Sequence, residues 1–290
     1  MDVMASTALW AMHPAFLDAV LKRGTIESIL PDALQMLAGI GGPKEARSAD
    51  PIREGATVIV PVYGLIAPRG TYAGTGTYSD VLAARMREFA ADAKVGAIVL
   101  DLRSPGGLVY GTAEAGDAIF EARQAKPVIA VANPYSFSAC HWLGTQATAY
   151  YATTSGEIGS VGVRSGHTDV SGFEDKIGMK TTLVASSPDK IAGHPYGPLS
   201  DEDRAEIQAS VDESNQAFVA AIARGRGIRA SDVAGIHGSG KCFSATAAAA
   251  NGAIDGVMTL RDVVAKFGSS RARLDLMRRK AAVSEMAAAI

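Results

Sequence analysis

The chain has 290 residues, 48% hydrophobic and 20% charged, a composition that predicts a globular protein with a large core and excludes intrinsic disorder. Its formal net charge of -2 at pH 7 excludes the strongly basic field that holds nucleic acid. The two cysteines, Cys140 and Cys242, provide neither a disulfide framework nor a metal-ligand cluster, so we expect a reducing compartment, no metal and no cofactor.

The N-terminal stretch MDVMASTALWAMHPAFLDAVLKRG lacks the features of a signal peptide. Its first charge is acidic, and His13 and Pro14 interrupt its apolar part. No later segment has the roughly 18 unbroken apolar residues that span a bilayer. We therefore expect a cytoplasmic protein without a membrane partner. Residues 1–50 are predicted to form an N-terminal helical arm and linker, because loosely helical apolar spacing at 14–38 precedes a Gly- and Pro-rich stretch.

From residue 51 onward, apolar β-branched runs alternate with helical patterns. Strands are expected at 56–66, 95–102 and 126–133, and helices at 79–93, 111–124 and 200–226, the last with Ser200 as N-cap. This alternation predicts an α/β fold in which helices flank a parallel sheet and sites form at strand ends. We expect one such domain at 51–268 and a C-terminal tail at 269–290.

The stretch PYSFSACHWLGTQA, which begins at residue 134, holds three candidate nucleophiles and a histidine. Ser138 fits the first turn of a helix, where its Oγ would meet the positive helix end, whereas Ser136 is expected to be an N-cap. Cys140 and His141 are sequence neighbours on that helix and point about 100° apart, so they do not form a nucleophile and base pair.

Two glycine-rich turns, SPGG at 104–107 and GEIGSVGV at 156–163, follow predicted strands. Paired glycines let backbone N–H groups face a cleft, as an oxyanion hole requires, although they also serve as plain tight turns. The five histidines offer no convincing partner for Ser138, but a lysine can serve as a base instead when burial lowers its pKa toward neutrality. Lys190 is one candidate, because it lies between a strand-like run at 181–185 and a Gly- and Pro-rich turn.

An ordered set of motifs runs from about residue 55 to 265: VIVPVYGLI, AIVLDLRSPGG, KPVIA, SACHWLGTQA, GEIGSVGV, FEDKIGMK, SSPDK, VDESNQAF, ARGRGI and KCFSATAAAANGAIDGV. In this order they resemble the signal peptide peptidase A family of serine peptidases, which use a Ser/Lys dyad. The closer likeness is to its phage branch, the capsid assembly proteases of the minor capsid protein C type. The resemblance implies the α/β spiral that crotonases share with the Clp proteolytic subunit.

The resemblance also implies a role for each matched residue. The catalytic nucleophile falls on Ser138 and the general base on Lys190. The serine that orients the lysine falls on Ser160. The oxyanion donors fall on the N–H groups of Gly107 and Ala139.

A substrate pocket is expected beside the nucleophile, formed by Gly106, Leu108, His141 and Trp142, the last two as pocket wall or as packing. Cys140 and His141 replace the small residue and the Tyr or Gly usual after the family's serine. This departure affects the shape of the pocket and not the dyad.

As a function, the resemblance implies a serine endopeptidase of a phage or prophage head that cleaves scaffold, capsid or portal-associated proteins. It also implies a homo-oligomeric ring, with a serine and lysine that in some relatives meet across a subunit boundary, in the host cytoplasm or the procapsid interior. Three alternatives stay open: a bacterial cytoplasmic peptidase that degrades signal peptides, a catalytically silent capsid component, and an acyl-CoA enzyme of the same fold.

Overall fold

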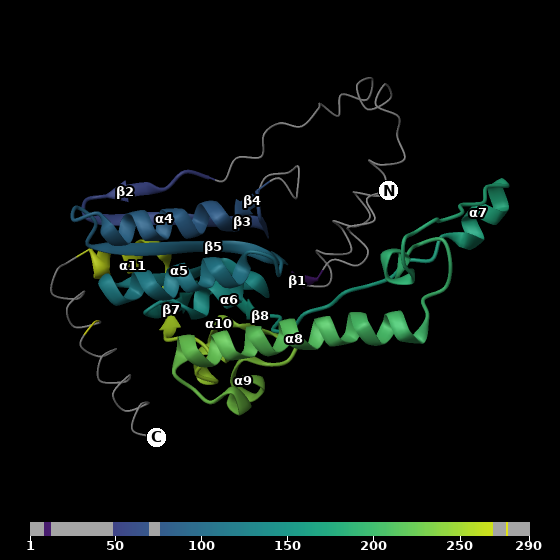
Figure 1. Ribbon diagram of the computed structural model, residues 1–290. Coiled ribbons are helices and arrows are strands. Elements are labelled where there is room, and N and C mark those ends of the chain that lie inside the picture. Colours follow the sequence, from purple (N-terminus) through teal and green to yellow (C-terminus); the bar gives the residue numbers. More distant parts are fainter. Residues whose placement is uncertain (1–8, 13–48, 70–75, 269–276, 278–290) are drawn as a thin grey trace.

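The computed structural model describes residues 9–12, 49–69, 76–268 and 277 (Figure 1). In this part of the chain, a ten-stranded sheet forms the centre of the molecule, and its main path runs in the order β10-β7-β6-β5-β3-β2. The strands of that path are β2 (Ile52–Glu54), β3 (Thr57–Ala67), β5 (Ala97–Leu108), β6 (Val128–Phe137), β7 (Ala149–Ala152) and β10 (Gly256–Val257). Neighbours on this path are parallel except for β2 and β3.

Four short strands pair off this path: β1 (Trp10–Met12), β4 (Gly76–Tyr78), β8 (Glu157–Gly159) and β9 (Cys242–Ser244). β8 continues the pairing of β6 beyond the end of β7, and β1 pairs with the C-terminal end of β5. Near the C-terminal end of β6, at the carboxyl edge of the sheet, β5 and β6 therefore pair with other strands than in the centre of the sheet.

The central strands are buried on both faces, because helices cover the sheet from both sides. Along β5, Ile98, Leu100 and Leu102 belong to one apolar cluster, whereas Ala97 and Val99 belong to a second. This alternation follows from the two-residue period of a strand. It also explains why the sequence of β5 is an almost unbroken apolar run.

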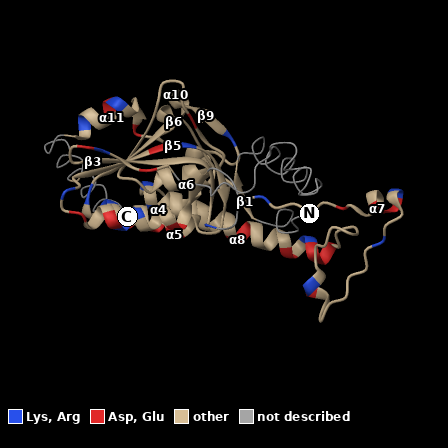
Figure 2. Cartoon of the chain, turned by 90° about the horizontal axis from the view of Figure 1, so that it is seen from above, with Lys and Arg blue, Asp and Glu red and all other residues tan. Residues whose placement is uncertain are grey.

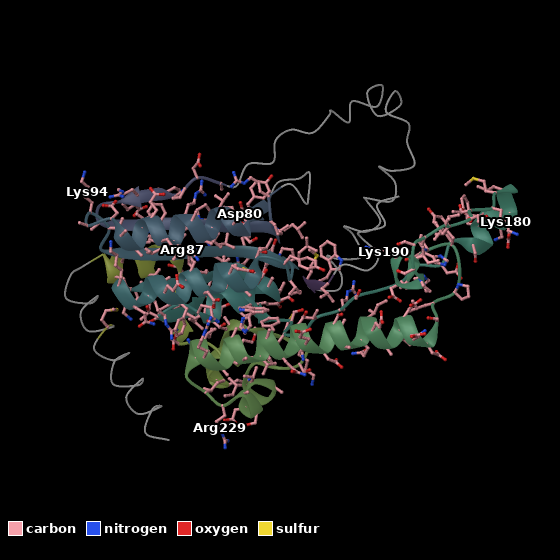
Figure 3. The ribbon with its side chains drawn as sticks, in the orientation of Figure 1. Asp80, Arg87, Lys94, Lys180, Lys190 and Arg229 are labelled. Atoms are coloured by element: carbon pink, nitrogen blue, oxygen red, sulfur yellow. The ribbon has the colours of Figure 1, made fainter. Side chains whose placement is uncertain are left out.

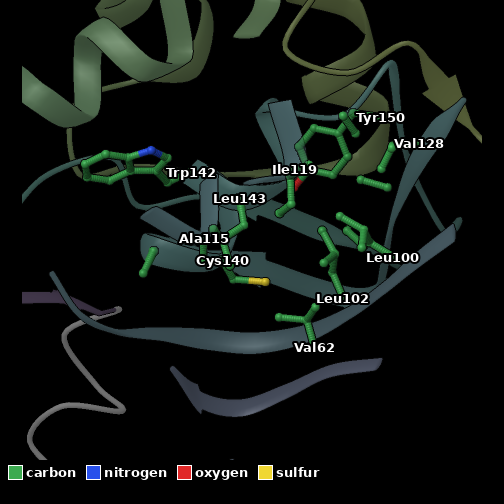
Figure 4. Packing of buried hydrophobic residues seen from close by; sticks show 14 of the residues in the cluster. Val62, Leu100, Leu102, Ala115, Ile119, Val128, Cys140, Trp142, Leu143 and Tyr150 are labelled. Carbon is green, nitrogen blue, oxygen red and sulfur yellow. The ribbon is translucent and has the colours of Figure 1, made fainter. Parts of the chain in front are cut away.

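The larger cluster lies under α4 (Ser79–Ala91), α5 (Thr112–Ala125) and α6 (Ala139–Thr145). Figure 4 shows Cys140 and Leu143 of α6 close to the apolar side chains of the sheet, with Trp142 farther from them. The opposite face is covered by α11 (Leu260–Phe267) (Figure 2), which buries Val263 and Phe267. The expected α/β fold with helices flanking a mostly parallel sheet is thus confirmed.

The longest helix, α8 (Asp201–Arg226), begins with the expected cap, since the Ser200 Oγ accepts a hydrogen bond from the Asp203 N–H at 3.0 Å. Its buried residues, from Phe218 to Gly225, all lie in its C-terminal part. The N-terminal part of α8 runs out from the sheet beside a projecting arm (Figure 1). We define the arm as residues 165–199; it carries α7 (Ser171–Ile177) and the short 3-10 helix η1 (Pro188–Ile191).

Several local predictions are wrong in detail. The SPGG sequence is no turn, because β5 continues through it to Leu108. Ser136 is no N-cap, because β6 continues to Phe137. Residues 181–185 form no strand and lie on the arm.

At the N-terminus, a strand was not expected, but Trp10–Met12 form β1. The rest of the predicted helical arm, residues 13–48, and nearly all of the predicted tail lie outside the described residues. α9 (Ala230–His237) and α10 (Ala245–Ala250) complete the described helices. Among these residues, no helix combines the length and apolar character needed to cross a membrane.

Candidate active site

Ser138 joins the end of β6 to the start of α6. Its backbone has φ 53° and ψ -117°, and its carbonyl oxygen accepts the Trp142 N–H at 2.9 Å, which begins the helix. Its own N–H donates to the Gly159 carbonyl at 2.8 Å. The Oγ lies 3.5 Å from the Gly162 carbonyl oxygen, a weak contact that leaves the hydroxyl available for other partners. Ser138 therefore stands at a sharp strand-to-helix turn at the carboxyl edge of the sheet.

Ser160 lies beside this turn because β8 pairs with β6, with Gly159 opposite Phe137. The Ser160 backbone has φ 57° and is held by a hydrogen bond from its N–H to the Lys241 carbonyl at 2.7 Å. In the described part of the chain, Ser138 and Ser160 are the two non-glycine residues with a positive φ. Such conformations cost on the order of 1–3 kcal/mol each and tend to occur at functional sites.

The end of β5 brings the SPGG sequence next to the serine turn. The Ser104 Oγ accepts the Gly106 N–H at 3.1 Å and donates to the Gly64 carbonyl at 2.6 Å, so the Gly106 N–H is already used. A Cβ at Gly107 would lie 1.8 Å from the Ile66 carbonyl oxygen, so only glycine fits there. The Gly107 N–H is then the candidate oxyanion donor of this strand end.

The second expected donor, the Ala139 N–H, belongs to the first residue of α6. The first N–H groups of a helix have no partner within the helix. The structure thus places Ser138, Ala139, Ser160 and Gly107 around one edge of the sheet.

Lys190 is not brought to this edge within one chain. It lies exposed in η1 on the projecting arm, as Figure 3 shows. Among the described residues it forms no hydrogen bond or ion pair with Ser138 or Ser160 through its side chain. The single chain therefore brings together the candidate nucleophile, the candidate oxyanion donors and the candidate supporting serine, whereas the candidate base lies elsewhere.

Cys140 belongs to the core. It is fully buried in α6 (Figure 4), and burial raises the pKa of its thiol to about 12. A thiol with such a pKa stays protonated near neutral pH, and the thiolate is the reactive form.

His141 and Trp142 are also enclosed by the core. The His141 Nε2 lies 3.0 Å from the His237 Nδ1, and its Nδ1 lies 3.2 Å from the Tyr150 hydroxyl. Burial, followed by His237 and Arg226, lowers the pKa of His141 well below its ordinary value. The Trp142 ring stacks on Phe218 at a centroid distance of 4.8 Å. Of the two roles expected for His141 and Trp142, the structure favours packing, which leaves Gly106 and Leu108 as pocket candidates.

Sequence reasoning missed one part of the site. β1 pairs with Gly106, Gly107 and Leu108, directly beside the candidate oxyanion donor. Three apolar residues have no periodicity that could reveal a strand, so no signal in the sequence marks this segment. In the described residues, no cluster of three or more His, Cys, Asp or Glu side chains could hold a metal ion.

Comparisons with known proteins agree with the motif order. Residues 121–273, slightly more than half of the chain, match the model of peptidase family S49. The chain is 33% identical over 204 residues to capsid assembly protease C of Escherichia phage lambda, covering 68% of this chain and 46% of the relative. It is 29% identical over 199 residues to head-tail preconnector protein GP5 of Enterobacteria phage P21, covering 67% of this chain and 39% of that protein.

A bacterial relative shows the same likeness. A putative signal peptide peptidase SppA of Enterococcus faecium is 24% identical over 172 residues, which is 59% of this chain and 50% of that protein. The chain thus spans half or less of the length of each of these three relatives. The family expected from the motifs is confirmed, and the chain belongs to peptidase family S49.

Proposed function

We propose that the protein is a serine endopeptidase that uses a Ser138/Lys190 dyad and acts on proteins of a phage or prophage head. The observation that carries the proposal is the strained Ser138 turn, which lies at the edge where Gly107, Ala139 and Ser160 meet. Membership in peptidase family S49 supports the reaction type. The printed names of the lambda and P21 relatives support the phage head as its setting.

In the proposed mechanism, neutral Lys190 accepts the proton of the Ser138 hydroxyl while the Oγ attacks a peptide carbonyl carbon. The Ser160 hydroxyl orients the lysine. The developing oxyanion is stabilised by the N–H groups of Gly107 and Ala139, a kind of donor worth about 10²–10³ in kcat each. The protonated lysine gives its proton to the leaving amine, and water then hydrolyses the acyl-enzyme.

Assembly completes the dyad in this proposal. Lys190 is exposed on an arm that also exposes large apolar side chains: Phe173, Ile177, Met179, Leu183 and Val184. Clustered exposed apolar side chains mark an interaction surface. We propose a second copy of this chain as the occupant, in a closed ring, because the arm would carry Lys190 to the neighbour's Ser138.

The test is complementation between two inactive variants. Ser138→Ala and Lys190→Ala should each lose cleavage of a co-expressed phage scaffold protein by about 10⁴-fold or more. When the two purified variants are dissociated and reassembled together, mixed rings contain intact sites and recover cleavage. The matched control is Ser138→Ala mixed with the double variant Ser138→Ala/Lys190→Ala, which stays inactive. Recovery in the control mixture, or no loss in the single variants, contradicts the proposal.

Chemical labelling tests the nucleophile without a substrate. A fluorophosphonate probe should modify Ser138 in the assembled protein, and mass spectrometry of the peptide that contains residue 138 identifies the adduct. Labelling should disappear in Ser138→Ala and persist in Cys140→Ala. An assembled protein without label at Ser138 would instead be a catalytically silent head component.

A further inference from the structure

β1 occupies a groove beside the candidate nucleophile. β6 accompanies β5 as far as Ser104, where it pairs through Ser136, and then ends at the serine turn. From Gly106 onward, β1 takes the place of β6 beside β5, running antiparallel to it with Trp10 opposite Leu108. The segment therefore lies where a sheet edge would otherwise be open to a peptide from outside.

The groove binds this segment from two sides. On one side, the Val109 N–H donates to the Leu9 carbonyl oxygen at 3.1 Å. On the other side, the Trp10 N–H donates to the Arg164 carbonyl at 2.9 Å, and the Arg164 N–H donates to the Trp10 carbonyl at 3.0 Å. Main-chain pairing of this kind recognises a peptide largely independently of its sequence.

The register directs one particular carbonyl at the oxyanion donor. Along two antiparallel strands, every second pair of opposite residues is hydrogen-bonded. Leu9 and Val109 form such a pair, so the next hydrogen-bonded pair is Ala11 and Gly107. This places the Ala11 carbonyl opposite the Gly107 N–H.

The same carbonyl is close to the serine turn. A Cβ at Gly106 would lie 2.2 Å from the Ala11 carbonyl oxygen and 3.0 Å from the Phe137 carbonyl oxygen, next to Ser138. The Met12 Cα also lies 3.0 Å from that point. The peptide group between Ala11 and Met12 therefore lies close to Phe137, the residue that precedes Ser138.

The side chains of β1 define the pattern that this groove accepts. Trp10 and Met12 form a small separate apolar cluster with Leu65, Ala67 and Leu108. Ala11 points the other way, is fully buried, and contacts the main core. A bound peptide would accordingly need a small side chain at the position of Ala11 and bulky apolar side chains on either side.

We propose that β1 occupies the substrate groove in the direction and register of a substrate, with Ala11 at the residue whose carbonyl is attacked. A protein substrate with the pattern bulky, small, bulky must displace β1 before it can bind. This inference rests on the proposed peptidase function. β1 is a ligand that can be exchanged, since it is three residues long and buries the Trp10 indole N–H with no hydrogen-bond partner among the described residues.

A longer peptide has room for further contacts beyond β1. A cavity of about 240 Å³ begins at Leu9 and continues between Tyr110 and the outer part of α8, including Asp203 and Glu206. A substrate that extends upstream of the β1 position could fill this cavity. Its affinity can therefore exceed that of the segment it displaces.

The experiment measures binding of a fluorescein-labelled peptide with the sequence of residues 7–12, TALWAM, amidated at its C-terminus. It uses the full chain with Ser138→Ala, so that binding is read without cleavage. Trp10→Pro removes the N–H that donates to Arg164 and the side chain that fills the apolar cluster. The matched control is Ile52→Pro, because β2 is also a three-residue antiparallel strand and its Ile52 is exposed.

Trp10→Pro should lower the Kd of the labelled peptide by about tenfold, because a larger fraction of the protein then has an open groove. Ile52→Pro should leave the Kd unchanged. Met12→Ala, which keeps the backbone pairing and folds more readily, should give a smaller decrease in Kd. An unchanged Kd in Trp10→Pro and Met12→Ala, or loss of binding in both, would show that β1 is a fixed wall of the site and overturn the inference.

The same variants separate this inference from the proposed function. In the chain with Ser138 intact, Trp10→Pro should lower KM for a peptide substrate about tenfold and leave kcat unchanged. If Trp10→Pro changes peptide binding but the protein with Ser138 intact never cleaves, the proposed peptidase function is wrong and the inference that β1 occupies the groove stands. If Ser138 cleaves the substrate but neither Trp10→Pro nor Met12→Ala changes KM, the peptidase function stands and the inference on β1 is wrong.

Discussion

At the residue scale, the candidate site depends on two serines held in costly backbone conformations. The motif order predicted Ser138 as the nucleophile and Ser160 as a supporting serine, and both have a positive φ. The sequence could not reveal these angles, because they follow from tertiary bonds, such as the one between the Ser138 N–H and the Gly159 carbonyl. The position of Lys190 could not be read from spacing either, because the arm that carries it leaves the sheet.

The strain at Ser138 can be measured by comparing two variants that both lack the hydroxyl. Glycine adopts φ 53° without the steric penalty that a Cβ brings, so Ser138→Gly should be more stable than Ser138→Ala by about 1 kcal/mol in the free energy of unfolding. Urea denaturation at pH 7 gives the difference. Equal stability of the two variants would mean that the turn is relaxed.

The buried histidine pair should make stability depend on pH. Burial, followed by the nearby Arg226, lowers the pKa of His237 to about 4. Because the unfolded chain binds this proton near its ordinary pKa of about 6.5, the folded state loses stability as the pH falls from about 7 toward 4. For His237 alone the loss between pH 8 and pH 5 amounts to about 2 kcal/mol.

His237→Gln should reduce this dependence. The variant will be less stable at every pH, since the partner of the His141 Nε2 is altered, but its loss between pH 8 and pH 5 should be smaller by about 2 kcal/mol. Urea unfolding at both pH values gives the comparison. The idea fails if wild type and variant lose the same amount.

At the element scale, sequence patterns located the central strands and the helices between them. They placed the C-terminal ends of β5 and β6 too early. Pro and Gly in SPGG normally break a strand, so a turn was predicted at 104–107. Pairing with β3 on one side and β1 on the other carries β5 through to Leu108 instead. β1 itself was missed because its strand conformation depends on partners far along the chain.

α11 should matter for stability, because it alone among the described helices packs against the second face of the sheet through its own apolar residues. Phe267→Ala should lower the free energy of unfolding by about 3 kcal/mol, since Phe267 is 3% exposed and its removal leaves a cavity against Tyr151. Arg261→Ala, at an exposed position of the same helix, should change it by less than about 0.5 kcal/mol. Similar effects for both substitutions would indicate that α11 does not hold the sheet.

At the scale of the whole molecule, a compact sheet body carries an arm on the side opposite α11 (Figures 1 and 2). The strand-like run at 181–185 forms no strand and lies on this arm, where Leu183 is 36% and Val184 95% exposed. Within one chain these side chains lack cover. In the proposed ring, a neighbouring molecule would supply that cover.

Charge on the arm should therefore disrupt assembly. Phe173→Asp/Val184→Asp should shift the protein from ring to monomer in sedimentation velocity and lower cleavage by at least about tenfold, because an apolar contact becomes a buried charge. Ile52→Asp, at an apolar position on β2 that is 60% exposed, should affect neither property. A ring that survives the arm substitutions would place the subunit contacts elsewhere.

The position of β1 in the chain also orders events during synthesis. β1 leaves the ribosome well before the end of β5 and long before Arg164, and it needs both of these partners to be held in place. Because domains fold as their residues emerge, the central sheet can form while this segment is still unattached. Ser138 emerges before Arg164, so for part of synthesis the serine turn exists while β1 still lacks one of its two partners.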